Sequence, residues 1–521
     1  MLADPLSFIE SVRGRHGPVA GLLLGGERVV LVSCPAAARQ VLIDRADIFV
    51  KEGTAFFPGS ALTGNGLLVS DGDVWRRQRR LSNPAFRRAA VEGYAGQMAV
   101  ETQRLLRGPL AAAAAPQGYQ GGGRGSPSPY SNYSIAGGGG GGGVVDVYAE
   151  FNKLTLNITL AALFGLSADD EAEAAGGRGA AAGGGVAARV VAAVERAFAF
   201  FANRGAAAMV VPEWVPTPDN LEFGAAVREL DDLVYGIIRR RRAALRAAAA
   251  AQLAQQREGT AGAEGGGGGG GARAAPPDLL QGLLEAVDDD GSGLSDVALR
   301  DEAMTLLVAG QETSAILLGW AAALLAHHPA AQDAAAAEVA AALPPGRPPG
   351  AGDVAALPRV TGVVLEALRL YSPAYMVGRC ASADVELAGG YRLPRGTTVL
   401  VSPYLLHRDP NHWEEPLRFK PERWDDLMRP SGDAAGGGGG GGYPFAAALR
   451  EMGPNGAYVP FGGGPRNCIG AGFAMIEAVL VLAALLQRYR LAPPPNAGFP
   501  RPKALLTLRP DGVPVAVSRR T

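Results

Sequence analysis

One cysteine of this chain lies in a loop that is unusually poor in side chains. Cys468 belongs to the stretch FGGGPRNCIG at residues 461–470, and an apolar, helix-forming stretch, AGFAMIEAVLVLAALLQ, follows it. At the start of a helix, the helix dipole and the unpaired backbone N–H groups favour a thiolate. Close N–H groups also tune a sulfur as a ligand, and Arg466 adds a positive charge nearby. A small buried side chain is nevertheless the commonest role of a free cysteine, so both interpretations stay open at this point.

A second group of interest interrupts a long helix predicted for residues 295–328. The segment VAGQET places Gly310, Glu312 and Thr313 within a run of good helix formers. A threonine in the middle of a helix often donates to the carbonyl oxygen four residues earlier, here that of Ala309, and bends the helix. This local bond and a chemical role for Thr313 are both compatible with the sequence.

Three charged segments could position a ligand or brace a loop. EALR places Glu366 and Arg369 three residues apart on one helix face, where they can pair. FKPERW supplies Arg423, and DVWRRQRR places Trp75 and Arg79 one helical turn apart. Each segment also has a simpler explanation, because exposed ion pairs contribute little to stability and basic runs are often solvated helix faces.

The composition excludes several classes of protein. The net charge is −1, which gives no overall attraction for nucleic acid or anionic membranes. Three cysteines in 521 residues exclude a disulfide framework, and none has the CxxC spacing of a zinc or iron–sulfur site. The start of the chain lacks the apolar core of a signal peptide and has no membrane-spanning segment. The apolar stretches 316–326 and 474–486 are short, and we expect both to be buried core helices.

Helical patterns dominate between four low-complexity inserts. Glycine-rich runs cannot repay their conformational entropy by burial, so we expect surface loops at 116–143, 172–185, 259–277 and 434–442. Helices are predicted over 73–88, 186–204, 222–251, 295–328, 329–342 and 359–371. Strands are predicted as turn-bounded pairs in 21–33 and 389–403, and as a final hairpin of 504–510 with 513–520 around Asp511-Gly512. The chain is therefore predicted to be mainly α with small β-sheets, an α+β protein.

The cysteine loop resembles the heme-ligand loop of the cytochrome P450 family, whose pattern is F-x-x-G-x-R-x-C-x-G. The fixed positions of that pattern are occupied by Phe461, Gly464, Arg466, Cys468 and Gly470. The other motifs follow in the family's order, and the resemblance covers nearly the whole chain outside the inserts. It implies a single heme-thiolate monooxygenase domain over 1–521. Heme b would lie between the oxygen-binding helix that carries Thr313 and the helix after Cys468.

The resemblance also implies which residues contact the heme. Cys468 would supply the axial thiolate and would be the only protein ligand of the metal. Three segments of the chain, DVWRRQRR, YSPAYMVGRCAS and the cysteine loop, would hold the propionates. The residues concerned are Trp75, Arg79, Arg379 and Arg466, and Phe461 is a further cofactor-binding position on the loop.

VAGQET resembles the oxygen-binding groove of the same family, A/G-G-x-D/E-T. Gly310 would make room for dioxygen, Thr313 would donate a hydrogen bond to the bound oxygen, and Glu312 would help to deliver protons. Cleavage of the O–O bond to give water requires two protons at one oxygen atom, which is the chemical reason for a hydroxyl and a carboxyl group at this place.

Two further sets of residues follow from the resemblance. Glu366, Arg369 and Arg423 would form a structural network that braces the cysteine loop, and His407 of HRDP would lie in a structural turn. The substrate would contact an apolar lining from the loop before Trp75, the oxygen-binding helix and the segments around 375 and 506. The expected lining residues are Phe56, Phe57, Leu62, Met304, Leu307, Ala309, Tyr375, Met376 and Leu506.

The implied activity is insertion of one oxygen atom from O2 into a C–H bond of a lipophilic small molecule, such as a fatty acid, terpenoid or carotenoid. Electrons would come from an NADPH-dependent flavin reductase or a ferredoxin that docks near the basic Trp75–Arg88 helix. Two alternatives stay open: a heme-thiolate isomerase that rearranges peroxides without an electron donor, and a non-catalytic heme-binding protein. The localisation is left open between cytoplasmic, organellar (plastid) and peripheral to a membrane.

Overall fold

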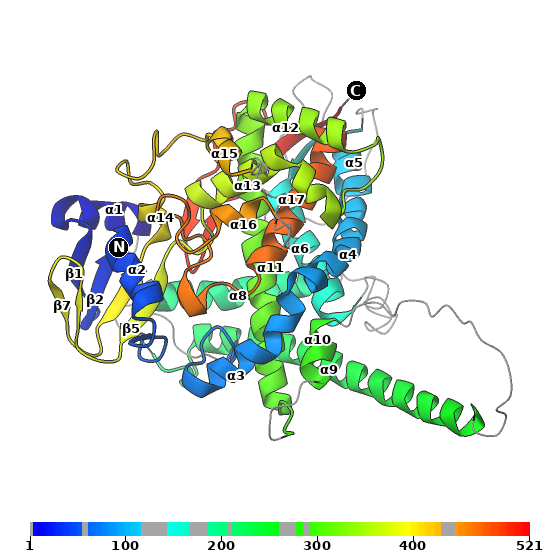
Figure 1. Cartoon of the computed structure of the whole chain (residues 1–521), viewed down its shortest axis with the longest axis horizontal. Helices are drawn as coiled ribbons and strands as arrows, with labels where there is room; N and C mark the ends of the chain where they lie inside the picture. The colour runs from blue at the N-terminus through cyan, green and yellow to red at the C-terminus, as the bar shows by residue number, and fades with distance from the viewer. Residues whose placement is uncertain are drawn as a thin grey trace, which may run out of the picture.

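The computed structural model describes residues 4–54, 61–115, 143–166, 186–206, 211–259, 278–285, 291–428 and 443–520. The four predicted surface loops fall almost wholly outside these ranges, as do Phe56 and Phe57 of the expected substrate lining. The described part is a large helical body with small sheets at one side and at its edges (Figure 1), as the sequence predicts.

The α-helices of the described residues are α1 (Pro5–His16), α2 (Pro35–Arg39), α3 (Gly72–Ser82), α4 (Arg88–Arg107), α5 (Pro109–Ala113), α6 (Val147–Phe164), α8 (Val186–Ala206), α9 (Pro218–Gly259), α10 (Leu279–Glu285), α11 (Asp296–His327), α12 (Pro329–Ala342), α13 (Pro358–Leu370), α14 (Pro403–Leu406), α15 (Asp425–Met428), α16 (Phe445–Ala448) and α17 (Ala471–Arg488). Shorter helical turns are η1 (Gln40–Asp44), η2 (Asn83–Phe86), η4 (Ala351–Ala356), η5 (Pro421–Trp424) and η6 (Gly464–Arg466).

The strands are β1 (Val19–Leu24), β2 (Glu27–Val32), β3 (Phe49–Val50), β4 (Val144–Asp146), β5 (Val377–Ala381), β6 (Val385–Leu387), β7 (Tyr391–Leu393), β8 (Thr398–Val401), β9 (Tyr489–Ala492), β10 (Pro502–Ala504), β11 (Leu508–Pro510) and β12 (Pro514–Arg519). They form a five-stranded sheet in the order β1-β2-β8-β5-β3, a three-stranded sheet in the order β4-β12-β9, and two two-stranded sheets, β10-β11 and β6-β7.

The hairpin predicted within residues 21–33 is confirmed. β1 and β2 pair antiparallel, with Val19 opposite Val32. Their turn is formed by Gly25 and Gly26, and both glycines have positive φ angles, 59° and 88°. A two-residue hairpin turn of this kind needs positive φ at both positions, which glycine adopts without steric cost.

The other two predicted strand pairs are wrong. β7 pairs with β6, whereas β8 pairs with β5 and runs parallel to β2. Three of the four residues of β8 are buried, so its side chains gain more from a central position than from a hairpin at an edge. Likewise, β11 pairs with β10 while β12 lies between β4 and β9, so Asp511 and Gly512 connect two different sheets. Local turn residues do not reveal which distant strand offers the better partner.

Most predicted helices agree with the structure, and the exceptions have a local cause. α12 has the predicted bounds, and α11 and α13 begin and end within one residue of them. α3 ends at Ser82 rather than at residue 88, because Pro84 ends the helix and residues 83–86 form a 3-10 turn before α4 begins. α4 and α6 are two long helices that were not predicted.

The hydrophobic core is organised around α11. One contiguous cluster of buried apolar side chains contains residues between Leu62 and Val517, and α6, α13 and α17 pack against α11 (Figure 1). Within the described chain, α11 and α17 are long and apolar enough to cross a membrane, but both are mostly buried in the protein. This agrees with the expectation of buried core helices at 316–326 and 474–486.

Two carboxyl groups lie within this apolar core. Glu302 of α11 and Glu477 of α17 are both 0% exposed. The backbone N–H of Leu67 lies near the first and the hydroxyl of Ser314 near the second, but neither makes a well-aligned hydrogen bond. Burial therefore dominates and raises the pKa of each carboxyl group to about 8.

These raised pKa values predict that the free energy of unfolding falls as pH rises from about 4.5 to about 8. In that window the folded protein keeps protons that the unfolded chain has already released. Glu477→Gln removes one such group, so it should leave stability at pH 5 nearly unchanged and raise the free energy of unfolding at pH 9 by about 1–4 kcal/mol. Chemical denaturation at several pH values measures this effect.

The control for that measurement is Glu222→Gln, because Glu222 is an exposed residue of α9. Its pH profile should match that of the unaltered protein. If Glu477→Gln also followed that profile at every pH, the carboxyl group at position 477 would not be held in its protonated form.

Candidate functional site

The loop that carries Cys468 is shaped by its contact with the N-terminal part of the chain. The Cys468 N–H donates to the carbonyl oxygen of Phe461 at 2.8 Å. Gly464 has a φ of 64°, and a side chain there would collide with the backbone of Leu42 in η1. A Cβ atom on Gly470 would lie 3.9 Å from the Cys468 sulfur. Gly464 is therefore required for close packing against η1, whereas a side chain at position 470 would meet the sulfur at an ordinary contact distance.

The Cys468 side chain is solvent-accessible. The surrounding protein nevertheless raises the pKa of its thiol, while the N–H of Gly470 and the charge of Arg79 act in the opposite direction. The thiolate-favouring effects expected from the sequence are thus present, but desolvation is larger. A bound cation at the sulfur would reverse this balance, because a coordinated thiol is deprotonated.

Several cations gather beside this loop. Arg379 is only 2% exposed, and burial lowers its pKa to about 10. Burial also lowers the pKa of Arg466 to about 10. Arg466 pairs with Asp71, and its guanidinium lies over the ring of Trp75, 4.3 Å from the centroid. Burial lowers the pKa of Lys51 well below its usual value, and the charges of Arg379 and Arg466 add to that effect.

This cluster fits a ligand with two carboxylates, such as heme. Burying three cations close together is costly unless anions compensate them. The Nη1 atom of Arg466 is buried and has no hydrogen-bond partner among the described residues. Sequence reasoning identified Trp75, Arg379 and Arg466 but missed Lys51 and Asp71. Neither of these belongs to a local motif, and only the folded chain brings them to this place.

Arg79 has a different observed partner from the propionate that the resemblance suggests. Its guanidinium donates to the backbone oxygen and to Oδ1 of Asn467, both at 2.8 Å. Arg79 therefore connects α3 to the residue that immediately precedes Cys468. Contact with a propionate stays a prediction for Arg79 and for Trp75.

One face of α11 is partly exposed to solvent at the place where the oxygen-binding groove was expected. Between residues 299 and 326, every residue is buried except Ala309, Gly310 and Thr313. These positions share one helix face. The Thr313 hydroxyl donates to the carbonyl oxygen of Ala309 at 2.7 Å, which is the local bond considered from the sequence. A Cβ atom on Gly310 would lie 3.2 Å from Oγ1 of Thr159, so the glycine permits close packing of α6.

Glu312 is directed away from that accessible face and towards the C-terminal strands. It is 4% exposed, and burial raises its pKa to about 7. The charge of Arg509 and a hydrogen bond with Thr507 act against that increase, whereas Glu195 contributes to it. A carboxyl group with this pKa can both hold and release a proton near neutral pH.

Glu366, Arg369 and Arg423 lie together, as the resemblance implies. Arg369 donates to both carboxylate oxygens of Glu366 at 3.0 and 2.8 Å, and Arg423 Nε donates to Oε1 at 3.0 Å. The indole N–H of Trp424 and the backbone N–H of Lys420 donate to the same carboxylate. Glu366 and Arg369 are both 0% exposed, so this is a fully buried ion pair with its hydrogen-bonding capacity largely used.

The same network reaches the cysteine loop through His407. Arg369 Nη1 donates to the His407 carbonyl oxygen at 2.7 Å, and His407 Nε2 accepts from the backbone N–H of Val459 at 2.9 Å. Burial, followed by the charges of Arg369 and Arg408, lowers the pKa of His407 well below its usual value. A neutral ring suits this role, because Nε2 must accept while Nδ1 donates to the Arg369 carbonyl oxygen.

The expected substrate lining is only partly accessible. Leu62, Met304 and Leu307 are 0–1% exposed and belong to the main core. Tyr375 is buried and donates to the carbonyl oxygen of Leu505 at 2.8 Å. Partial exposure is kept by Ala309, Met376 and Leu506. Their role as a substrate lining stays a prediction.

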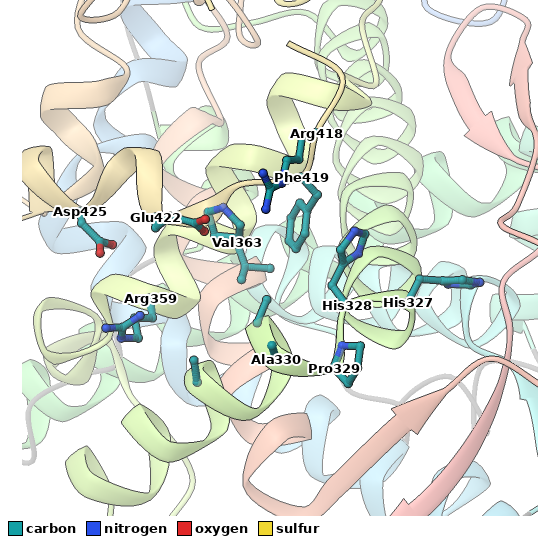
Figure 2. A pocket seen from close by; sticks show the side chains of 13 residues that line it. His327, His328, Pro329, Ala330, Arg359, Val363, Arg418, Phe419, Glu422 and Asp425 are labelled. Atoms are coloured by element: carbon teal, nitrogen blue, oxygen red, sulfur yellow. The ribbon is translucent and has the colours of Figure 1, made fainter. Parts of the chain in front are cut away.

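A hollow of about 530 Å³ lies at the end of α11, between α12, α13 and η5 (Figure 2). Its lining includes His328, Val363 and Phe419, and it contains none of the residues predicted for the site. No group of three His, Cys, Asp or Glu side chains within the described ranges could hold a metal ion.

Comparisons with known proteins agree with this geometry. The chain matches the cytochrome P450 family over residues 3–515. It is 32% identical over 516 residues to cyclooctatin synthase of Streptomyces melanosporofaciens, covering 98% of this chain and 91% of that protein. It is 28% identical over 511 residues to pentalenene oxygenase of Streptomyces avermitilis, with coverage of 98% and 91%.

Solved structures give the same result for the fold. The crystal structure of the cytochrome P450DA heme domain matches with a TM-score of 0.72 and 26% sequence identity, covering 99% of this chain and 93% of that one. The matches in sequence and structure extend over nearly the whole length, so they include the Cys468 loop and α11. The chain is a member of the cytochrome P450 family and a P450 monooxygenase.

Proposed function

We propose that this enzyme binds heme through Cys468 and inserts one oxygen atom of O2 into a C–H bond of a lipophilic small molecule, the other atom leaving as water. The observation that carries the proposal is the combination of an accessible Cys468 on a braced loop with the opening of α11 at Ala309, Gly310 and Thr313. The name of one relative, pentalenene oxygenase, supports the same type of reaction.

The residues around the loop would bind different parts of the heme. Cys468 would hold the iron, and the propionates would be neutralised by Arg379, Arg466 and Lys51. Bound heme with a thiolate ligand supplies the activation of dioxygen that this reaction requires. The Glu366 network would keep Cys468 in position, because it fixes Val459 just before the loop.

Protons would reach the oxygen-binding face through Thr313 and Glu312. The Thr313 hydroxyl has one proton, which the carbonyl oxygen of Ala309 accepts in this structure; turning the hydroxyl away from that oxygen would present the proton on the accessible face. Glu312 faces away from that side of α11, towards Thr507 and Arg509, so it would not pass a proton to Thr313 directly. Its pKa of about 7 would let it hold a proton behind the helix and exchange it near neutral pH.

Electrons would come from a flavin reductase or a ferredoxin that docks on the basic surface between Trp75 and Arg88. Arg76, Arg80 and Arg87 are exposed there, and Arg79 links the same helix to Asn467 beside the cysteine. Positive surfaces of this kind steer an acidic partner to its site. Turnover that depends on such a donor would exclude the isomerase and the non-catalytic heme-binding protein.

Cys468→Ala should abolish the absorption band that carbon monoxide gives with reduced, thiolate-ligated heme, because the band requires the thiolate that Cys468 would supply. Difference spectra of the purified protein measure this. Cys34→Ala is a matched control that should keep the band. Persistence of the band in Cys468→Ala would show that the ligand is a different residue.

Arg379→Gln should accelerate the loss of heme by roughly 10–100-fold, the factor expected when a buried, charge-assisted contact is removed. The rate of heme transfer to a scavenging protein measures it. Arg392→Gln serves as the control, since the Arg392 side chain is 88% exposed. Equal rates of heme loss in both variants would remove Arg379 from the propionate site.

Thr313→Ala should keep heme binding but divert electrons from product to hydrogen peroxide, because the hydroxyl that presents the proton is lost. The ratio of peroxide formed to electron donor consumed is the measurement. Thr313→Ser retains the hydroxyl and should remain close to the unaltered enzyme. Unchanged coupling in Thr313→Ala would rule out the proton-handling role.

A further inference from the structure

A stripe of polar side chains on α6 faces the oxygen-binding part of α11. Asn152, Thr155 and Thr159 follow one another at spacings of three and four residues, so they lie on one face of the helix. All three are buried, with exposures of 5%, 0% and 0%. Polar groups are costly at such positions unless they form hydrogen bonds, and their partners therefore indicate what the stripe does.

The partners are found on both helices. Thr155 Oγ1 donates to the backbone oxygen of Gln311 at 2.8 Å, and Gln311 Nε2 donates to Asn152 Oδ1 at 2.8 Å. Thr159 Oγ1 donates to the Thr155 carbonyl oxygen at 2.7 Å. Gln311 is itself only 2% exposed. α6 thus holds both the backbone and the side chain of the one residue that lies between Gly310 and Glu312.

The Thr155 hydroxyl has one proton but more than one carbonyl oxygen within reach. Besides Gln311 O, the carbonyl oxygens of Phe151 at 2.9 Å and Asn152 at 3.4 Å lie within its reach. A hydroxyl group donates one hydrogen bond at a time. The hydroxyl can therefore either tie α6 to α11 or return to its own helix, and rotation about the Cβ–Oγ1 bond exchanges the two states.

The tie to Gln311 lies within one turn of Thr313. The carbonyl oxygen of Ala309 accepts from Thr313, and that of Gln311 accepts from Thr155. Between them, Gly310 allows Thr159 to pack against the backbone. The hydroxyl groups of Thr313 and Thr155, one from each helix, thus donate to the carbonyl oxygens of Ala309 and Gln311. These two carbonyl groups lie two residues apart in the segment that forms the accessible face.

We propose that Thr155 is a positioning residue that fixes the turn of α11 carrying Gly310, Glu312 and Thr313 by donating to the carbonyl oxygen of Gln311. The inference rests on the proposed function, since it concerns proton delivery at that face. Thr155 touches neither heme nor substrate in this role. It acts by limiting how far the segment can rotate, so that the Thr313 hydroxyl keeps its orientation.

Thr155→Val tests the inference, because valine has nearly the same shape but cannot donate. The variant should keep its heme content and the carbon monoxide band of thiolate-ligated heme, while the fraction of electrons lost to peroxide rises about fivefold, as expected for the loss of one hydrogen bond. Thr155→Ser should restore coupling. Thr102→Val is the matched control, since Thr102 is a buried threonine of α4 whose hydroxyl, among the described residues, bonds only to Met98 O of its own helix.

A second readout does not depend on turnover. Amide hydrogen exchange of α11 peptides covering residues 309–315 should be faster in Thr155→Val than in the unaltered holoenzyme, while peptides of α17 remain unchanged. In the double variant Thr155→Val/Thr313→Ala, peroxide formation should equal that of Thr313→Ala alone, because both changes act through the same hydroxyl.

The outcomes separate this inference from the proposed function. If the unaltered enzyme couples electron use to product and Thr155→Val matches Thr102→Val in both peroxide yield and hydrogen exchange, only the positioning role is overturned. If Cys468→Ala keeps the carbon monoxide band, the proposed function fails first. Additive effects in the double variant would also contradict action of Thr155 through Thr313.

Discussion

The cysteine site depends on one buried carboxylate. Glu366 accepts hydrogen bonds from Arg369, Arg423, Trp424 and the backbone of Lys420. Removing one partner of such a buried pair costs about 3–5 kcal/mol, because the remaining charge has no solvent to stabilise it. The bonds join α13 to the chain around η5, and Arg369 extends them through His407 to the backbone just before the cysteine loop. The glycine loop gains this support in addition to the bonds from Arg79 to Asn467.

The charges around the site are arranged in two opposite ways. Beside the cysteine loop, buried cations with lowered pKa values gather around Arg379 and Arg466, as suits an anionic ligand. Along α11, the carboxyl groups of Glu302 and Glu312 have raised pKa values, as suits groups that keep or exchange protons. Desolvation causes both sets of shifts, since it disfavours the charged form whatever its sign. In the proposed function, the division would correspond to a cofactor-binding side and a proton-handling side.

α11, the proposed oxygen-binding helix, is held from two directions. α6 contacts it through a few buried hydrogen bonds and the close approach at Gly310, while β11 contacts it on another side, where Trp320 donates to the Leu508 carbonyl oxygen at 2.9 Å. A helix that is otherwise buried between residues 299 and 326 can therefore keep three residues partly accessible without losing its regular form. Packing of this kind would allow the proposed chemistry to take place within the core.

The sequence by itself determined the fold class, most helix positions, the first hairpin and the motif residues. These depend on local patterns: the glycine loop around Cys468, the spacing of Glu366 and Arg369, and the interruption at Gly310 and Thr313. Tertiary structure alone decided the pairing of β8 with β2, the bond of Arg79 to Asn467, and the approach of Asp71 to Arg466 across 395 residues of sequence. It also decided the tie between Thr155 and Gln311. Such pairs have no local signal, because their partners lie far apart in the sequence and meet only when the chain folds.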